Sequence, residues 1–435
     1  MPRIKILGGI TILIVILFAI AISISAPISN TEPENTISAD PYKKIEFDQK
    51  KTALIQIQQQ EELKTAVKAY FDKAIASGAL VGAGVSIVKG DSIVISDGFG
   101  KRNSKTNAGV DGQTIFRLGS LSKGFAGILA ANLIDEGKIH SEDKVSDYIP
   151  EFQLGDSYNT AKITLANILS HTAGAPYHSY TNLVEAGLSL TAIASRFKDV
   201  QPISNPGALY SYQNALFALS GEMMSKVTGQ KIATSLENRF FNPLEMCSTT
   251  MDYESLEEAE NVAMPHTKRR NGWRPKKLRN NYYNAIAAGG ISANADDMAK
   301  WMRFILGHNP EIMSKSALKE AFNPFIEIKG RSKYYQRWPG HVSSHYGYGW
   351  RIHKYVEGTS DQEKTIWHHG GSVNNYRNEI AVYPEADIGI CVLLNNNSGL
   401  AKTVVPDLYK IVQKVYKESI IKFTDNSMAN IPHFD

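Results

Sequence analysis

The stretch FRLGSLSKGF, residues 116–125, places a serine and a lysine one helical turn apart at the start of an apolar helix. Residues three apart lie on the same face of a helix, so Ser120 and Lys123 can touch, whereas Ser122 points away from them. The apolar run from Phe125 to Ile134 predicts that this helix is buried in the core. We therefore predict that Ser120 is a nucleophile on a rigid element; the alternative is that it only caps the helix.

The composition is that of an ordinary globular protein. With 435 residues, of which 43% are hydrophobic and 21% charged, the chain can bury a large core. A net charge of +4, together with the absence of a nucleic-acid-binding motif, argues against a nucleic-acid partner. Two cysteines, Cys247 and Cys391, are too few for a disulfide framework or a cysteine metal site, so we expect free thiols, with a single bridge as the alternative. No metal or other cofactor is expected.

The N-terminus predicts export. Residues from Ile6 to Ala26 are apolar or small, which is long enough for a membrane-spanning helix. Arg3 and Lys5 precede this run, so the positive-inside rule places the rest of the chain outside the cytoplasm, in the periplasm or at the cell surface. The run exceeds the core of a usual signal peptide, so we expect an uncleaved signal anchor over residues 1–26, with a cleaved signal peptide as the alternative.

The remaining chain is expected to contain a tether at 27–60, one folded domain at 61–420 and a tail at 421–435. Strand-like runs lie at both ends of the domain, and the segment of about 140–300 between them is mostly helix and loop. The expected strands are 81–88, 93–99, 348–355, 365–368, 379–383 and 388–394. This order predicts an α/β (α+β) fold, in which an antiparallel sheet built from both termini is flanked by helices and carries an inserted helical lobe.

Single motifs in this chain are weak, but an ordered set is informative. The SxxK pattern also begins at Ser86, Ser141, Ser195, Ser316 and Ser419. Ser120-x-x-Lys123, Tyr212-x-Asn214 and His368-x-Gly370-Gly371, in this order, resemble the motif series of the serine β-lactamase and penicillin-binding-protein superfamily, in its class C branch. The similarity spans about residues 61–416.

The resemblance implies a β-lactamase/transpeptidase-like fold and an acyl-enzyme mechanism through Ser120. In that family, Asn214 would contact the substrate amide oxygen and fix the lysine. The oxyanion hole would use the backbone N–H groups of Ser120 and Gly371. His368, Gly370 and Gly371 would bind substrate.

The residue types support the same chemistry. A serine hydroxyl needs a base, and no Gly-x-Ser-x-Gly elbow is present to suggest the α/β-hydrolase solution. Burial disfavours the charged form of lysine, so Lys123 in a closed pocket would be a neutral base for Ser120. Tyr212, if near Lys123, would have its phenolate favoured by positive charge and would act as a base or proton shuttle. The alternative for Tyr212 is an ordinary core tyrosine.

One departure from the β-lactamase pattern concerns the substrate. Class C β-lactamases normally carry lysine where His368 stands, and histidine there resembles the esterases and D-amino-acid peptidases of the same fold. The alternative is that His368 is structural.

We expect an exported serine hydrolase that acts on an ester, amide or lactam bond of a small molecule or cell-wall peptide. A D,D-carboxypeptidase or D-amino-acid peptidase acting on peptidoglycan fragments, and a penicillin-binding receptor without turnover, are the alternatives.

Overall fold

The computed structural model describes residues 41–429, and their side chains from residue 52 to residue 418. The chain divides into a first unit that ends at Thr52 and a second that begins at Ala53. Residues 41–52, the described part of the first unit, are helical. The second unit holds the sheet, the helices that cover it and all three sequence motifs.

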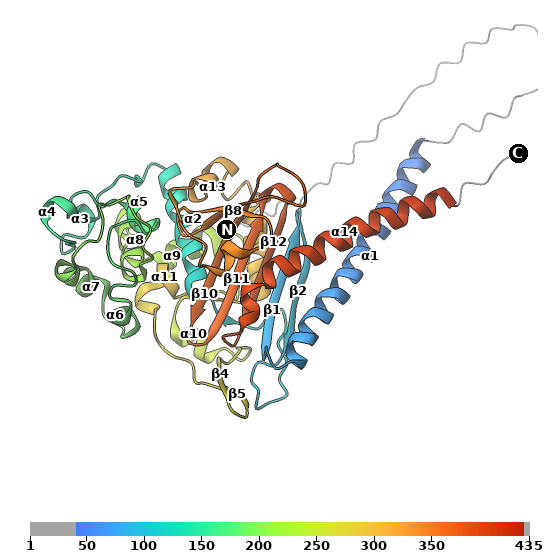
Figure 1. Ribbon diagram of the computed structural model, residues 1–435, viewed down its shortest axis with the longest axis horizontal. Helices are drawn as coiled ribbons and strands as arrows, with labels where there is room; N and C mark the ends of the chain where they lie inside the picture. Colours follow the sequence, from blue (N-terminus) through green and yellow to red (C-terminus); the bar gives the residue numbers. More distant parts are fainter. Residues whose placement is uncertain (1–40, 430–435) are drawn as a thin grey trace, which may run out of the picture. The chain divides into compact units, whose positions relative to one another are not determined.

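An antiparallel eight-stranded sheet forms the centre of the second unit, in the order β2-β1-β12-β11-β10-β9-β8-β7 (Figure 1). Its strands are β1 (Gly82–Lys89), β2 (Ser92–Gly100), β7 (Ile326–Glu327), β8 (His341–Tyr346), β9 (Arg351–Tyr355), β10 (Lys364–Val373), β11 (Tyr376–Tyr383) and β12 (Ile388–Leu394). Strand β1 pairs with β12, so both ends of the chain build the sheet and the predicted fold class is confirmed. Every residue of β12 is buried, as expected for a central strand covered on both faces.

Two short strand pairs lie outside this sheet. β3 (Phe116–Arg117) pairs with β6 (Ser292–Ala293), and β4 (His266–Arg269) pairs with β5 (Gly272–Pro275). Strand β3 comes just before the turn that leads into the nucleophile helix, so its pairing with β6 holds the chain at this point.

The helices of the middle of the chain form the inserted lobe, and they surround the long central helix α2. The helices after α1 (Pro41–Ala76) are α2 (Ser122–Asp135), α3 (Val145–Tyr148), α4 (Ser157–Thr160), α5 (Leu165–Leu169), α6 (Thr181–Glu185), α7 (Leu190–Arg196), α8 (Asn214–Thr228), α9 (Ile232–Leu236), α10 (Tyr253–Glu258), α11 (Ile286–Gly289), α12 (Ala295–Ile305), α13 (Lys315–Ala321) and α14 (Val404–Ala429). All residues of α2 from Ser122 to Leu133 are buried, because its run of apolar and small side chains packs on every side.

Two hydrophobic cores lie on opposite faces of the sheet. The first joins α2 and the helical lobe to the sheet and includes Phe125 and Trp301, whose rings stack 4.2 Å apart. The second joins the sheet to the helices at the two ends of the chain, where Phe71 of α1 and Leu408 of α14 are fully buried (Figure 1). The site therefore rests on a sheet that is covered on both sides.

The boundaries of several elements differ from the sequence prediction. Helix α1 spans Pro41–Ala76, so residues 41–60, expected as a tether, are helical. This segment has no glycine or proline between Tyr42 and Ala76 and is rich in lysine, glutamate and glutamine, which are good helix formers. Helix α14 likewise continues to Ala429, into the expected tail. Strand β8 was not predicted, because its sequence HVSSHY lacks an apolar run.

The predicted membrane anchor, Ile6–Ala26, lies outside the described residues. Within residues 41–429, no helix combines the length and apolar character needed to cross a bilayer.

Candidate active site

The nucleophile motif lies on a tight turn that leads into the buried helix. A 3₁₀ turn, η1 (Gly119–Leu121), carries Ser120 and is followed at once by α2. Gly119 adopts φ +57°, a left-handed conformation that side chains disfavour, so glycine is required at this turn. Lys123 is fully buried, and its Nζ lies 3.4 Å from Oγ of Ser120. The structure thus brings together the serine and lysine predicted from their spacing.

The hydrogen bonds of Lys123 suit a neutral amine. Its Nζ donates to Oδ1 of Asn214 at 2.7 Å and to the carbonyl oxygen of Ala288 at 2.7 Å. Burial lowers the pKa of Lys123 well below its ordinary value, and the nearby Arg351 lowers it further. A neutral amine has two N–H donors, which these two oxygens use, and one lone pair, which is left for the hydroxyl proton of Ser120. Lys123 is therefore arranged as a base.

The second motif lies at the start of helix α8, beside Lys123. Asn214 is the first residue of this helix, and its Nδ2 donates to the hydroxyl of Tyr282 at 3.3 Å. The ring of Tyr212 lies 4.9 Å from Nζ of Lys123 and is packed against the ring of His171 at 4.1 Å. The motif therefore reaches the nucleophile from the helical lobe.

The state of Tyr212 differs from the expected phenolate. Burial raises the pKa of Tyr212 to about 12, although Arg351 and a hydrogen bond with Ser120 oppose this rise. The phenol is therefore protonated at neutral pH. It can pass a proton between partners, but it is not a preformed base.

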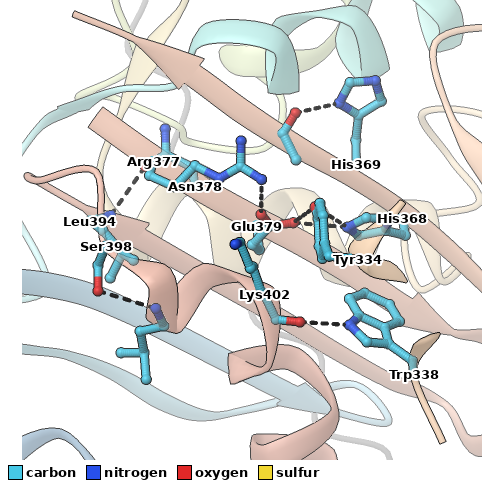
Figure 2. Close-up of polar contacts among 12 residues, drawn as sticks. Tyr334, Trp338, His368, His369, Arg377, Asn378, Glu379, Leu394, Ser398 and Lys402 are labelled. Carbon is cyan, nitrogen blue, oxygen red and sulfur yellow. Dashed lines mark hydrogen bonds and ion pairs between the residues drawn. The ribbon is translucent and has the colours of Figure 1, made fainter. Parts of the chain in front are cut away.

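The third motif lies on β10, and its two histidines face opposite sides of that strand, as neighbours in a strand do. His369 bonds to the hydroxyl of Tyr346 at 2.9 Å, and its ring is 6.3 Å from that of Tyr212. His368 is fully buried on the other side, with Nε2 2.8 Å from Glu379 Oε2. In Figure 2, His368 and Glu379 turn toward one another, and His369 lies apart from them.

The structure thus differs from the prediction for His368. This residue does not line the cleft beside Ser120, because other side chains cover it. Burial also lowers the pKa of His368 well below its ordinary value, and the cations Arg351 and Arg377 act in the same direction. The expected direct contact of His368 with the substrate is therefore not supported, and His369 is the histidine on the side of Tyr212.

The glycines of the third motif let β10 approach the nucleophile turn. A Cβ on Gly371 would collide with the carbonyl oxygen of Leu118, and it would lie 2.8 Å from Cδ1 of Leu121. A Cβ on Gly119 would in turn come within 3.0–3.1 Å of the backbone of Ser372. Gly370 and Ser372 line the cleft, whereas Gly371 faces the nucleophile turn. The strand and the turn are therefore in direct backbone contact.

A cleft of about 550 Å³ opens in front of Ser120. Tyrosine side chains form much of its wall, and its charged lining residues are Glu185, Lys333, Arg351 and Arg377. Arg351, on β9, is partly buried, and its buried Nε and Nη1 have no hydrogen-bond partner among the described residues. The cleft therefore offers unused donors on a fixed positive charge.

Sequence reasoning missed several residues at or beside this cleft, among them Tyr334, Arg351, Ser372, Arg377 and Glu379. Arg351 and Glu379 lie in strands that were predicted, and a charged residue in a buried strand is the signal that could have drawn attention to them. Tyr334 lies in a short 3₁₀ turn, η5 (Tyr334–Arg337), for which the sequence has no comparable signal.

The comparison with protein families agrees with this geometry. The family model described as Beta-lactamase matches residues 67–411, which is most of the chain. The chain belongs to the Beta-lactamase family. This assignment confirms the superfamily resemblance that the three motifs suggested.

Individual relatives of this family are distant. Protein flp of Staphylococcus aureus (strain NCTC 8325 / PS 47) is 24% identical over 361 residues, which cover 80% of this chain and 66% of that protein. Unguisins hydrolase ungD' of Aspergillus campestris is 25% identical over 330 residues, covering 71% of this chain and 57% of that protein. The chain thus spans about two thirds or less of the length of these curated relatives.

A solved structure supports the fold. The octameric penicillin-binding protein homologue from Pyrococcus abyssi superposes with a TM-score of 0.66 at 22% identity, covering 82% of this chain and 81% of that one. At this identity the likeness concerns the fold alone. Members of the Beta-lactamase family with this fold act on small-molecule or peptide substrates.

Proposed function

We propose that this protein is a serine hydrolase of the class C β-lactamase-related branch, which acylates Ser120 and releases the acyl group to water. The observation that carries the proposal is the contact of Ser120 with a buried lysine whose two N–H donors are already bonded. A buried lysine without a carboxylate partner is costly for a fold, which favours a chemical role for Lys123 over a purely structural one.

The mechanism follows from this arrangement. The lone pair of Lys123 takes the hydroxyl proton as Ser120 Oγ attacks the carbonyl carbon of the substrate. The backbone N–H of Ser120 and one from β10 hold the negative charge that develops on the carbonyl oxygen. Because Ser372 lines the cleft and packs against Gly119, we assign the second N–H to Ser372 in place of Gly371. The phenol of Tyr212 gives its proton to the leaving group and takes up the proton held by Lys123, so both groups return to their starting state. Water then attacks the acyl carbon and gives its proton to Lys123, and Ser120 Oγ leaves and regains that proton.

The charge of the cleft favours substrates that carry a carboxylate. The lining of the cleft includes three cationic side chains, Lys333, Arg351 and Arg377, and one carboxylate, Glu185. The unused donors of Arg351 would pair with an anionic group. This observation keeps a D-amino-acid peptidase as the second candidate, because a peptide with a free C-terminus supplies such a carboxylate.

The place of action is part of the same proposal. The apolar run from Ile6 to Ala26, preceded by Arg3 and Lys5, would anchor the protein in a membrane with the catalytic domain outside the cytoplasm. Protease accessibility of the domain in intact cells tests this, since a protected domain would contradict export.

A labelling experiment tests the chemistry. A fluorescent fluorophosphonate should label the wild type and not Ser120→Ala, and p-nitrophenyl esters, nitrocefin and D-alanyl peptides then rank the substrate classes. Failure of any Ser120-dependent label would refute the hydrolase. A label from fluorescent penicillin that never decays would favour a receptor without turnover.

A further inference from the structure

A chain of hydrogen bonds runs through the sheet behind the cleft. His341 Nε2 lies 2.7 Å from Ser344 Oγ, which lies 2.8 Å from His353 Nδ1. His353 Nε2 is 3.0 Å from His368 Nδ1, and His368 Nε2 is 2.8 Å from Glu379 Oε2. Ser344, His353, His368 and Glu379 are buried, whereas His341 is partly exposed and lines a separate surface groove. We call these five residues the relay.

The far end of the relay reaches the catalytic cleft. The hydroxyl of Tyr334 donates to Oε2 of Glu379 at 2.7 Å, and Nη2 of Arg377 lies 3.1 Å from Oε1 of Glu379 (Figure 2). Tyr334 and Arg377 both line the cleft in front of Ser120. Glu379 therefore sets whether Arg377, one of the cations of the cleft, has a counter-charge.

The direction of every bond in the relay is fixed by the charge of Glu379. An ionised carboxylate only accepts, so His368 Nε2 must carry a proton and His368 Nδ1 must accept from His353 Nε2–H. His353 Nδ1 then accepts from the hydroxyl of Ser344, which accepts from His341 Nε2–H. With all three imidazoles neutral, each link has one donor and one acceptor.

Protonation of Glu379 gives a second, equally bonded arrangement. A proton from water binds Nδ1 of His341, and the Nε2 proton of His341 moves to Ser344. The hydroxyl proton of Ser344 moves to His353 Nδ1, the Nε2 proton of His353 moves to His368 Nδ1, and the Nε2 proton of His368 moves to Glu379. One proton is gained, every bond reverses, and the imidazoles end neutral in the opposite tautomer.

We propose that Glu379 is a specificity-determining residue of the cleft: protons reach it from His341 through the relay, and its protonation releases Arg377 to bind anionic substrates. The proposal rests on the proposed function only for its effect on substrates. The two tautomeric states of the relay exist whether or not Ser120 reacts.

The surroundings place the added proton on Glu379. The titratable or charged groups that face this carboxyl are His368 from β10, Tyr334 from η5, Arg351 from β9 and Arg377 from its own strand. Cys391 of β12 lies opposite Ile380, on the other face of the sheet. Burial raises the pKa of Glu379 to about 7, although Arg377 and Tyr334 act against this rise. Burial lowers the pKa of both His353 and His368 well below the ordinary value, so the imidazoles stay neutral.

The first experiment observes the relay without any substrate. Full-length protein labelled with ¹⁵N-histidine is followed by NMR between pH 8 and pH 6, with signals assigned by single substitution of His353 and of His368. We expect both residues to change from the Nε2–H to the Nδ1–H tautomer while remaining neutral. An imidazolium at either position, or tautomers that do not change with pH, would overturn the relay.

The second experiment measures substrate preference with two matched esters, neutral p-nitrophenyl butyrate and anionic p-nitrophenyl hemisuccinate. Lowering the pH from 8 to 6 should reduce KM for the anionic ester by up to about tenfold, which corresponds to one charge-assisted contact. KM for the neutral ester should stay unchanged. Equal changes for both esters would refute the specificity role.

Variants separate the relay from general pH effects. Glu379→Gln is always neutral. With its amide nitrogen in the place of Oε2 it can donate to His368 Nε2 and to the hydroxyl oxygen of Tyr334, while its oxygen lies beside Arg377, so it should hold the low-pH tautomers and a pH-independent KM ratio. His345→Asn is the matched control, because His345 lies on β8 beside Ser344 and outside the relay. It should behave as the wild type, and a lost pH response in this control would contradict the assignment. If neither ester is hydrolysed, the proposed function fails while the NMR result still decides the relay.

Discussion

Gly371 faces the carbonyl oxygen of Leu118 so closely that any side chain at position 371 would collide with it. This contact joins the third motif on β10 to the residue that precedes the nucleophile turn. Asn378, opposite Gly371 on β11, donates to the same carbonyl oxygen at 3.1 Å and to that of Arg117 at 2.8 Å. The strand pair is thus fixed to the backbone immediately before Ser120.

Gly371→Ala should therefore damage catalysis more than it damages the fold. The added methyl would push β10 away from the turn and separate the two N–H groups of the oxyanion hole, so kcat should fall by about 100-fold or more. Overpacking of this kind costs roughly 1–3 kcal/mol of stability, which a thermal unfolding curve would record. Gly399→Ala is the control, because its Cβ would meet no atom within 4 Å. Unchanged turnover in Gly371→Ala would contradict the proposed hole.

Ser120→Ala and Lys123→Ala should each abolish turnover. Because the two side chains act as one unit, the double variant should be little worse than either single one. Steady-state kinetics with a p-nitrophenyl ester measures this, and losses that simply add would argue against coupling.

Ser122, the first residue of α2, should matter for stability but not for the chemical step. Its Oγ accepts a hydrogen bond from the backbone N–H of Ile291 at 3.1 Å, and the side chain is fully buried. Ser122→Ala should cost about 1 kcal/mol of stability while keeping the chemical step. Denaturant unfolding measures the loss of stability, and kcat measures the chemical step. A loss of kcat as large as that of Ser120→Ala would contradict a purely structural role for Ser122.

The two histidines of β10 can be told apart by the same substitution. His369→Lys would place an ammonium near Tyr212 and should increase acylation by nitrocefin relative to an ester, by up to about tenfold. His368→Lys should give no such gain, because that side chain is enclosed with Glu379 behind Tyr334. Stopped-flow acylation rates of the two variants decide this. A gain only in His368→Lys would restore His368 as the contact for the substrate.

The sequence predicts the sheet and the proximity of Ser120 to Lys123, for a physical reason. Strand β12 is a continuous apolar run, β1 is largely apolar, and residues 380–383 form the apolar half of β11. Ser120 and Lys123 are related by the period of one helix. These are local patterns. The strands at both ends of the domain predicted one sheet built from both termini, but not that β1 pairs with β12.

The sequence could not show which of two adjacent strand residues faces which part of the structure. His368 and His369 are identical in type and adjacent, and only tertiary packing decides which of them meets Tyr212 and which meets Glu379. The state of Tyr212 was likewise set by burial, which outweighs the nearby cation Arg351. Arg351 itself lies in a strand expected to be ordinary, and its unused donors appear only when its neighbours are known.

The pH profile of kcat should report Lys123. The base form is the deprotonated amine, so activity should rise with pH through the lowered pKa of Lys123 and then level off. Tyr212, with a pKa raised to about 12, stays protonated over this range. Tyr212→Phe should therefore lower the plateau by about 10²–10⁴-fold, the usual effect of a proton-transfer group, without moving the ascending limb. A shifted limb in Tyr212→Phe would show that Tyr212 is the titrating base.

Arg351 should govern substrate charge at every pH. Arg351→Met keeps an unbranched side chain of similar reach and removes the fixed cation whose Nε and Nη1 are unused in the cleft. KM for p-nitrophenyl hemisuccinate should rise by roughly 10–100-fold, the loss of one or two charge-assisted hydrogen bonds, while KM for p-nitrophenyl butyrate stays within about twofold. Arg331→Met removes an exposed cation that does not line the cleft and should change neither value. Unlike the effect of Glu379, this loss should be the same at pH 6 and pH 8, because arginine does not titrate there. Equal losses for both esters would mean that Arg351 supports the tyrosine wall, where it lies 4.9 Å from the ring of Tyr335, and does not select the substrate.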